Sequence, residues 1–423
     1  MCYDTRKLKM RILDNQPPKR ANGRMKMNKI LAILALCGFA TVGCEPAPDL
    51  LPSNDNAPPA VNQPAPELPT PPAGPVRSAF KGCKVDKTLD LGEGHIGTVA
   101  ANDVGFIVNW QDQSAAKSAA PYALQTFNYN GQSMSDKLRI GYTRITTGKN
   151  DYLAVYSTVL DPKVSNWITQ RIGQSGEVSS PNWFPVEPIA SAEDDNYRLV
   201  MLKTESVTNG CLKQFVTGLF NQNNHFVQQN EYILDTIACF QATGDVWIQD
   251  VYKLDDVVLI GVKQSNVWSI KYHLVALGKN HGYAWYDLAK TTDKYIISSF
   301  ALNGEIGIVW SDAGQNKFLS TMGLNYGPGV FKTTYKLPEY FTFNYYDGEM
   351  LIGLLYDDVV EKYYLARVSS TGNLVDKVEL PANYVPEFSI AGKNGRYVVV
   401  SATTGMVSTF KTPKVTVNIV TCN

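Results

Sequence analysis

The sequence predicts an all-β fold for residues 83–423, and three observations support this prediction. The segment is rich in Val, Ile, Tyr, Thr and Phe, which are the residues that favour strands. Gly, Asn and Asp interrupt it at short intervals, as they do at turns. No window shows a sustained apolar period of about 3.6 residues, which an amphipathic helix would need.

The N-terminal residues 1–43 have the pattern of a secretory signal peptide. Lys26 and Lys29 precede the apolar run Ile30–Val42, which is too short for a membrane-spanning helix of about 20 residues. The positive residues followed by a short apolar run predict export, and we expect Met25 or Met27 to be the true start.

The apolar run ends in Thr41-Val42-Gly43-Cys44, which resembles the lipobox of bacterial lipoproteins. The resemblance implies that Cys44 carries fatty acyl chains such as palmitate and anchors the protein to a membrane. The alternative is an ordinary signal peptide cleaved near Gly43, which would leave Cys44 available for a disulfide. Glu45 favours the outer membrane, and the sequence leaves open whether the protein faces the periplasm or the cell surface.

Residues 44–82 are predicted to form a flexible tether. Eleven of the 23 prolines lie between residues 45 and 75, with Ala, Asn and Glu among them. Such a segment has little apolar surface to bury and tends toward an extended polyproline conformation. It is expected to separate the folded part from the membrane.

The β-rich part repeats one pattern seven times, in which a short polar turn is followed directly by an apolar strand. The turns are Asn102-Asp103, Asn150-Asp151, Asp194-Asp195, Asp255-Asp256, Asn303-Gly304, Asp347-Gly348 and Asn394-Gly395. Successive turns are 44 to 61 residues apart, and a second hairpin follows each of these strands. Four strands repeated seven times predict a seven-bladed β-propeller.

The two ends of this region are expected to meet. The last unit, residues 386–421, contains three strands. Lys84–Leu91, at the start of the region, is similar to residues 374–380, the outer strand of the sixth unit. The N-terminal strand is therefore predicted to complete the seventh blade.

The cysteines support the same closure. Beyond Cys44 four remain, and an even number in an exported protein favours two disulfides. Three pairings are open in principle. The predicted topology favours Cys83 with Cys422 and Cys211 with Cys239.

Carboxylates and aromatic residues at one end of the strands are the candidate binding residues. They follow the second strand of a unit or lie near the connections between blades, so we expect them on one face. They are Trp110, Asp112, Trp167, Trp268, Asp312, Asp357 and His95. Such groups could bind a sugar, a peptide or a cation, but for the carboxylates a role as strand-end caps is favoured.

Other chemistry finds little support in the sequence. Gly92–Gly97 matches the pattern GxGxxG, but a β-hairpin follows instead of the helix that a dinucleotide site requires, so we predict a connection between blades. The four histidines lack metal-ligand spacing, so neither a metal nor a cofactor is expected. Residues 44–423 carry 30 basic and 37 acidic side chains, which argues against a nucleic-acid partner.

Three functions remain open. A non-enzymatic, lipid-anchored envelope protein that binds a protein or glycan is favoured, because no catalytic constellation is evident. The alternative is a carbohydrate-active enzyme, a glycosidase or lyase, that uses Asp112, Asp312, Asp357 and His95 at the mouth of the propeller channel. A third interpretation is a scaffold subunit of a larger envelope complex.

Overall fold

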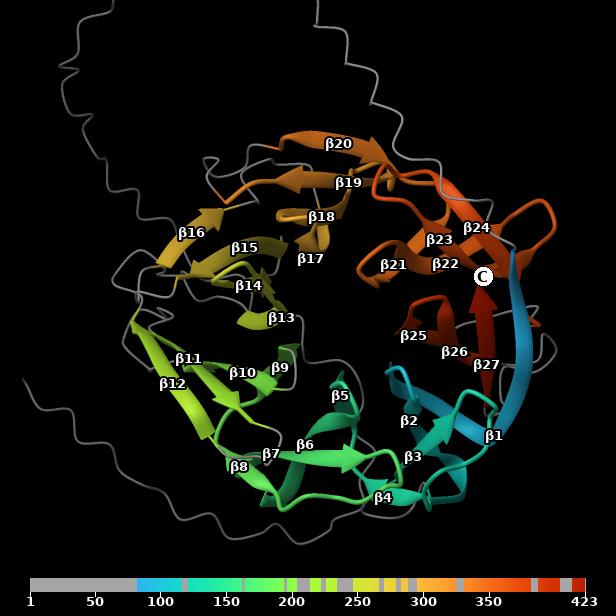
Figure 1. The fold of residues 1–423 in the computed structure, drawn as a ribbon, viewed down its shortest axis with the longest axis horizontal. Helices are drawn as coiled ribbons and strands as arrows, with labels where there is room; N and C mark the ends of the chain where they lie inside the picture. The colour runs from blue at the N-terminus through green and yellow to red at the C-terminus, as the bar shows by residue number, and fades with distance from the viewer. Residues whose placement is uncertain are drawn as a thin grey trace, which may run out of the picture. The chain divides into compact units, whose positions relative to one another are not determined.

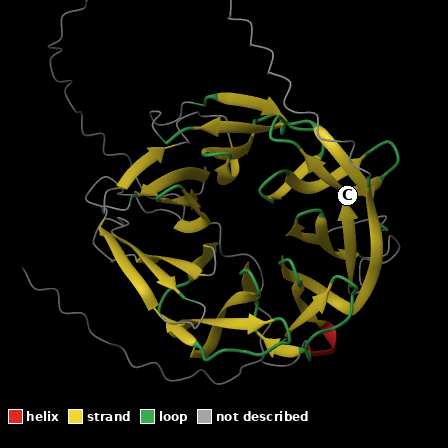
Figure 2. Ribbon diagram, in the orientation of Figure 1, coloured by secondary structure: helices red, strands yellow, loops and turns green. Residues whose placement is uncertain are grey.

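The computed structural model describes residues 82–115, 121–161, 164–193, 196–203, 214–221, 226–233, 246–265, 270–278, 283–287, 295–324, 331–381, 387–403 and 413–422. The chain divides into two units, residues 1–74 and 75–423, and the described residues all belong to the second. Antiparallel strands dominate this part (Figure 2), and the short 3-10 helix η1 (Gln113–Ala115) is the one helix described there. Among the described residues, no helix is long and apolar enough to cross a bilayer.

Five sheets contain four strands each, in the order in which the strands follow along the chain. The first contains β5 (Thr143–Thr147), β6 (Asp151–Asp161), β7 (Val164–Gly173) and β8 (Asn182–Phe184). The second contains β9 (Pro188–Glu193), β10 (Asn196–Lys203), β11 (Gln214–Phe220) and β12 (Phe226–Ile233). The third contains β13 (Val246–Leu254), β14 (Val257–Ser265), β15 (Ile270–Leu277) and β16 (Tyr283–Asp287). The fourth contains β17 (Tyr295–Leu302), β18 (Glu305–Ser311), β19 (Lys317–Met322) and β20 (Thr333–Lys336), and the fifth contains β21 (Phe341–Tyr346), β22 (Leu351–Asp357), β23 (Lys362–Val368) and β24 (Leu374–Glu379).

A seven-stranded sheet joins the two ends of the described chain. It has the order β25 (Glu387–Lys393), β26 (Arg396–Thr403), β27 (Lys414–Cys422), β1 (Cys83–Ala101), β2 (Gly105–Asp112), β3 (Tyr122–Asn128) and β4 (Leu138–Ile140). The first half of β1 pairs with β27 and the second half pairs with β2. β1 is therefore the fourth strand of one four-stranded group and the first strand of the next.

Gly92–Gly97 was predicted to be a connection between blades, and it does lie where β1 passes from the group of β27 to the group of β2. It is part of the continuous strand β1, however, and not a flexible loop. Gly92 adopts φ +94°, where the pairing with β27 shifts register. A Cβ atom on Gly94 would collide with the backbone oxygen of Gln111, so glycine is needed where the strand passes from one partner to the other.

The sheets follow one another around a common centre (Figure 1). The first strand of each four-stranded sheet is innermost and the fourth is outermost, as for β21 and β24. The polar turns between first and second strands lie at one end of the strands, which we call the turn side. The loops between second and third strands, and the connections to the next sheet, lie at the other end, which we call the loop side.

The apolar core lies between neighbouring sheets. One cluster joins Ile107 and Leu124 to Tyr152 and Ile172 of the next sheet, and all four side chains are buried. Another joins Ile352 and Leu365 to the next sheet around β26. Because both faces of each sheet are covered, the strands contain continuous apolar runs instead of strict alternation.

The predicted disulfide between Cys83 and Cys422 is present, across a sequence separation of 339 residues. The two cysteines are opposite each other where β1 pairs with β27. Cys211, Cys239 and Trp268 lie outside the described residues, so the second disulfide stays a prediction.

Candidate functional site

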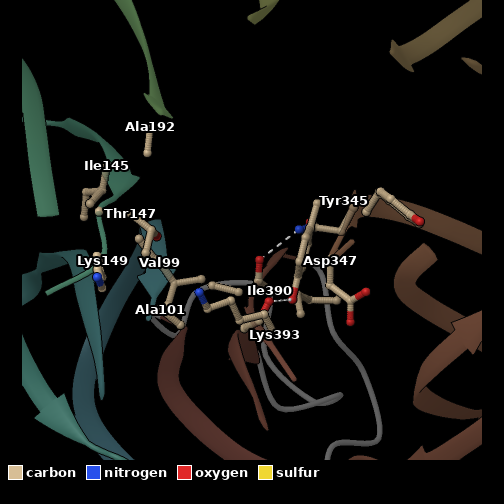
Figure 3. A pocket seen from close by; sticks show the side chains of 16 residues that line it. Val99, Ala101, Ile145, Thr147, Lys149, Ala192, Tyr345, Asp347, Ile390 and Lys393 are labelled. Atoms are coloured by element: carbon tan, nitrogen blue, oxygen red, sulfur yellow. Dashed lines mark hydrogen bonds between the residues drawn. The ribbon is translucent and has the colours of Figure 1, made fainter. Parts of the chain in front are cut away.

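The innermost strands enclose a pocket of about 670 Å³ near the turn side (Figure 3). It is formed by β1, β5, β9, β21, β25 and the turns that follow some of them. The residues lining it are Val99, Ala100, Ala101, Ile145, Thr147, Gly148, Lys149, Ala192, Asn344, Tyr345, Tyr346, Asp347, Ile390, Ala391, Gly392 and Lys393. This volume is within the range of pockets that hold small ligands.

The wall of the pocket combines small apolar side chains with a few polar groups. Ala101, Ala192 and Ala391 leave room where the inner strands converge, and Thr147 and Asn344 add hydrogen-bonding groups. In Figure 3, Ala192 lies on the same side of the pocket as Ile145, across from Tyr345 and Asp347. Such a surface offers contacts to the apolar faces and the hydroxyl groups of a ligand at the same time.

Two hydrogen bonds fix the part of the wall formed by β21 and β25. Asn344 Nδ2 donates to the backbone oxygen of Ile390 at 2.9 Å, and the Tyr345 hydroxyl donates to the backbone oxygen of Gly392 at 2.7 Å (Figure 3). Burial raises the pKa of Tyr345 well above its usual value, so the hydroxyl remains a donor. The wall is therefore formed before any ligand arrives.

Asp347 is the one carboxylate among the described residues that line this pocket, and its oxygens are already occupied. Its Oδ2 accepts a hydrogen bond of 2.6 Å from the Tyr397 hydroxyl, and its Oδ1 accepts from the backbone N–H groups of Glu349 and Met350 at 2.9 and 2.8 Å. These bonds shape the turn and join it to the next sheet. A pair of carboxylates of the kind that glycosidases use does not line this pocket as described.

Two lysines lie at the mouth of the pocket. Lys393 Nζ is 3.5 Å from Asp103 Oδ2, and both side chains are well exposed. Lys149 is exposed and lies in the turn after β5. The pocket lining thus includes two cationic side chains, one of them paired with Asp103.

None of the residues that line this pocket was predicted from the sequence to bind a ligand. Lys149, Asp347 and Lys393 lie within or directly before the polar turns by which the repeats were identified. Their position next to those turns could have indicated the pocket, because the innermost strands end at these turns and lie around the centre.

Three of the predicted binding residues meet on the loop side. In the pairing of β1 with β2, Ile96 is opposite Trp110, His95 opposite Gln111 and Gly94 opposite Asp112. Trp110 is 1% exposed, so its side chain belongs to the core and offers no binding surface. This corrects its assignment to a binding face.

Asp112 is a buried partner of two cations. Its Oδ2 is 3.2 Å from Lys137 Nζ and 2.8 Å from Arg139 Nη2. Burial alone would raise the pKa of Asp112, but hydrogen bonds from Ser114 and Lys137 lower it to about 2. The carboxylate is therefore a permanent anion and no general acid.

Asp312 and Asp357 cap turns, as the favoured interpretation predicted. Asp312 accepts from the backbone N–H and the side-chain amide of Asn316 at 2.8 and 2.9 Å. Asp357 accepts from the N–H groups of Val359 and Val360 at 3.3 and 3.4 Å. Asp312 follows β18 and Asp357 ends β22, so these two carboxylates and Asp112 lie on three different sheets. Trp167 is half-buried in β7.

His95 is paired with a residue that the sequence did not single out. Its Nδ1 is 3.1 Å from Glu387 Oε1, and Glu387 Oε2 accepts from the backbone N–H of Ile96 at 3.2 Å. Tyr122 lies in the same cluster, with its ring 5.8 Å from that of the exposed Tyr142. Burial, followed by Tyr142 and Glu387, raises the pKa of Tyr122.

A buried carboxylate between two sheets was also missed. Asp250 accepts hydrogen bonds from the Tyr272 hydroxyl at 2.6 Å, from the Ser298 hydroxyl at 3.0 Å and from the Ser299 N–H at 3.1 Å. Burial raises the pKa of Asp250 and lowers that of the nearby Lys263. The network joins β13 to β17 and does not line the pocket.

One group of metal-donor atoms occurs in the described part of the chain. Cys83, Cys422 and Asp376 approach one another, with Asp376 Oδ2 3.1 Å from Cys83 Sγ. Both sulfur atoms are in the disulfide, so the carboxylate is the one remaining donor. The chemistry of this set in the oxidised protein does not fit a metal.

No protein-family model matches the chain, and no curated protein matches it. Among solved structures, it is similar to an ulvan lyase, a polysaccharide lyase, with TM-score 0.48 and 11% identity over 79% of this chain and 96% of that one. It is also similar to a prolyl endopeptidase, with TM-score 0.47 and 9% identity over 74% and 46% of the two chains. A Synechocystis apocarotenoid oxygenase gives TM-score 0.39 and 7% identity over 67% and 71%. At these low values, none of the three carries an argument about the activity of this chain.

Proposed function

We propose that the protein is a lipid-anchored binding module of the bacterial cell envelope. Residues 83–423 form a closed seven-bladed β-propeller in this proposal, and the central pocket takes a glycan or a protein segment. The sharing of β1 between two four-stranded groups supports seven blades, and its pairing with β27 supports closure. The lipobox-like Cys44 and the Pro-rich residues 44–82 support a tethered position at the outer membrane.

The observation that carries the binding role is the pocket itself. It has a rigid, mixed polar and apolar wall, and its one described carboxylate is held by Tyr397 and two backbone amides. Donors and acceptors above small apolar side chains match a glycan, whose hydroxyl groups alternate with apolar ring faces. A glycan segment is therefore the ligand that this wall favours.

The substitution Ala192→Trp tests the pocket, because the new side chain fills the opening without entering the core. The full chain would be applied to an array of envelope oligosaccharides. We expect the unaltered protein to bind and the Ala192→Trp variant to lose about tenfold or more in affinity. Val178→Trp is the matched control, since Val178 is exposed at 43% and does not line the pocket. Equal binding by Ala192→Trp and the unaltered protein would contradict the proposal.

The anchor has its own test. Growth with labelled palmitate should label the unaltered protein, and Cys44→Ser should abolish the label and release the protein from the membrane fraction. Retained label in the Cys44→Ser variant would contradict lipidation at this residue.

One observation favours the alternative of a carbohydrate-active enzyme. The Glu387 carboxylate holds His95 Nδ1 at 3.1 Å beside Tyr122, and a carboxylate-oriented imidazole can transfer protons. The predicted carboxylates Asp112, Asp312 and Asp357 do not support this alternative, because each is occupied by cations or turn amides. Release of reducing ends from envelope glycans, abolished in His95→Gln, would favour the enzyme over the binding module.

A further inference from the structure

An exposed apolar surface lies on the loop side, away from the pocket. It consists of the exposed Tyr340, Val359 and Val360 and the half-buried Tyr356 and Tyr363, which we call the tyrosine–valine patch. Val359 is 87% exposed, Val360 51% and Tyr340 49%. Clustered apolar side chains in contact with water commonly mark interaction sites.

The three tyrosine rings of the patch form a continuous row. The rings of Tyr340 and Tyr356 are 6.4 Å apart in an edge-to-face arrangement, and those of Tyr356 and Tyr363 are 4.9 Å apart. The tip of the turn between β22 and β23 carries the two valines beside this row. The patch is thus an aromatic platform next to an apolar projection.

Hydrogen bonds fix the backbone of the patch without any contribution from the side chains of the two valines. Asp357 accepts from the N–H groups of Val359 and Val360, and the Tyr356 N–H donates to the Tyr340 oxygen at 3.4 Å. Tyr340 and Glu361 adopt φ +58° and +54°, a conformation that costs energy for residues other than glycine. Polar residues are usual in a turn like that between β22 and β23. Folding therefore explains neither the two exposed valines of this turn nor the strained conformation of Tyr340.

The surroundings of the patch are acidic. Glu339, Asp358 and Glu361 are exposed next to it. The nearby cations already have acidic partners, because Lys377 pairs with Asp357 and Lys362 pairs with Glu379. The pKa of Tyr340 is raised by Asp358 and Glu339, as expected in a negative field.

We propose that the tyrosine–valine patch docks a basic segment of a partner protein, in which Arg or Lys flanks an apolar side chain. The cations would contact Asp358, Glu361 and the tyrosine ring faces, and the apolar side chain would cover the valines. The negative charge disfavours an anionic membrane, and a neutral glycan would gain little from the valines. Charge complementarity therefore selects the basic protein segment.

This surface is independent of the proposed pocket. Strand β22 begins beside the turn of Asp347 and ends at Asp357, so its seven residues separate the two sites by about 20 Å. A ligand in the pocket and a partner on the patch could be bound at the same time. Such a protein would join a ligand to a second envelope protein.

The test measures binding of the full chain to two synthetic octapeptides, one alternating Arg with Leu and one alternating Glu with Leu. We expect saturable binding of the Arg–Leu peptide, which weakens with added salt, and no binding of the Glu–Leu peptide. The double substitution Val359→Ser and Val360→Ser should reduce the affinity about tenfold. The double substitution Val104→Ser and Val178→Ser is the matched control, because both valines are exposed on the turn side, and it should change nothing.

Three results would overturn the proposal. They are equal binding of the two peptides, unchanged Arg–Leu binding in the Val359→Ser and Val360→Ser variant, and no binding of the Arg–Leu peptide at all. Binding of the patch to anionic lipid vesicles instead would identify a membrane surface. Loss of peptide binding with intact glycan binding, or the reverse, separates this proposal from that of the pocket.

Discussion

The turn side and the loop side differ in the interactions that their side chains make. On the turn side, Asn303, Gly304, Asn394 and Gly395 all adopt positive φ in short hairpins, and a tyrosine of the next sheet holds the turn at Asp347. On the loop side, Tyr340 and Val359 are exposed to water. At these positions the turn side contains interactions between sheets, whereas the tyrosine–valine patch on the loop side displays side chains that the fold does not need.

This difference has an energetic consequence. A turn-side hydroxyl such as that of Tyr397 is buried with its acceptor on a neighbouring sheet, so its loss weakens the contact between sheets. An exposed loop-side side chain contributes little to folding. Stability and docking at the tyrosine–valine patch should therefore respond to substitutions at opposite ends of the strands.

The largest effect is expected from the disulfide on the turn side. Replacing Cys83 and Cys422 with Ser removes a crosslink across 339 residues. The free energy of unfolding should fall by about 6 kcal/mol on the chain-entropy model, as measured by urea unfolding. Val359→Ser with Val360→Ser is the loop-side control and should stay within about 0.5 kcal/mol of the unaltered protein. If the disulfide variant were as stable as this control, the turn side would contribute no more to the free energy of unfolding than the loop side.

A smaller effect should follow from Tyr397→Phe, which removes the hydroxyl that donates to Asp347 at 2.6 Å. The half-buried carboxylate of Asp347 loses one of its donors, so the free energy of unfolding should fall by about 1–2 kcal/mol. Tyr346→Phe is the matched control, because the Tyr346 hydroxyl donates to the Gly348 oxygen near the surface. Equal losses in both variants would show that the hydrogen bond from Tyr397 to Asp347 stabilises the fold no more than the exposed bond of Tyr346.

The two sides also differ in how far the sequence could predict them. The turns at Asp255, Asn303 and Asn394 were predicted because Asn, Asp and Gly tolerate positive φ, and this is a local property of each residue. The pairing of β1 with β27 followed from a likeness between two strands, and the structure contains it. These features depend on short stretches of sequence or on repetition.

What the sequence did not reveal depends on remote partners. The strand conformation around Gly92 was not predicted because β27, which pairs with the first half of β1, lies in a distant part of the chain. Trp110 looked like a rim residue, but Lys137 covers its ring at 5.2 Å and the core surrounds it. The pocket residues Lys149 and Lys393 were not predicted, because the packing of whole sheets decides which strand ends face the centre.

The smallest effect concerns pH and the buried loop-side ion pair of Asp112. Its pKa is about 2 in the folded protein and about 3.9 in an unfolded chain. A carboxyl group with a lowered folded pKa stabilises the fold fully above its unfolded pKa, and this contribution is lost as the pH falls toward the folded value. Asp112→Asn should therefore flatten the loss of stability between about pH 4 and pH 2, by about 1 kcal/mol.

Urea unfolding of the unaltered protein and Asp112→Asn at several pH values between 2 and 6 measures this effect. Burial raises the pKa of Asp250, so its contribution falls as the pH rises above about 3.9, but this change is common to both proteins and cancels in their difference. Asp312→Asn is the control, since Asp312 caps an exposed turn through Asn316. If Asp112→Asn and Asp312→Asn show the same pH dependence, the ion pair of Asp112 does not stabilise the fold. Burial of a loop-side carboxylate would then make no difference to its contribution to stability.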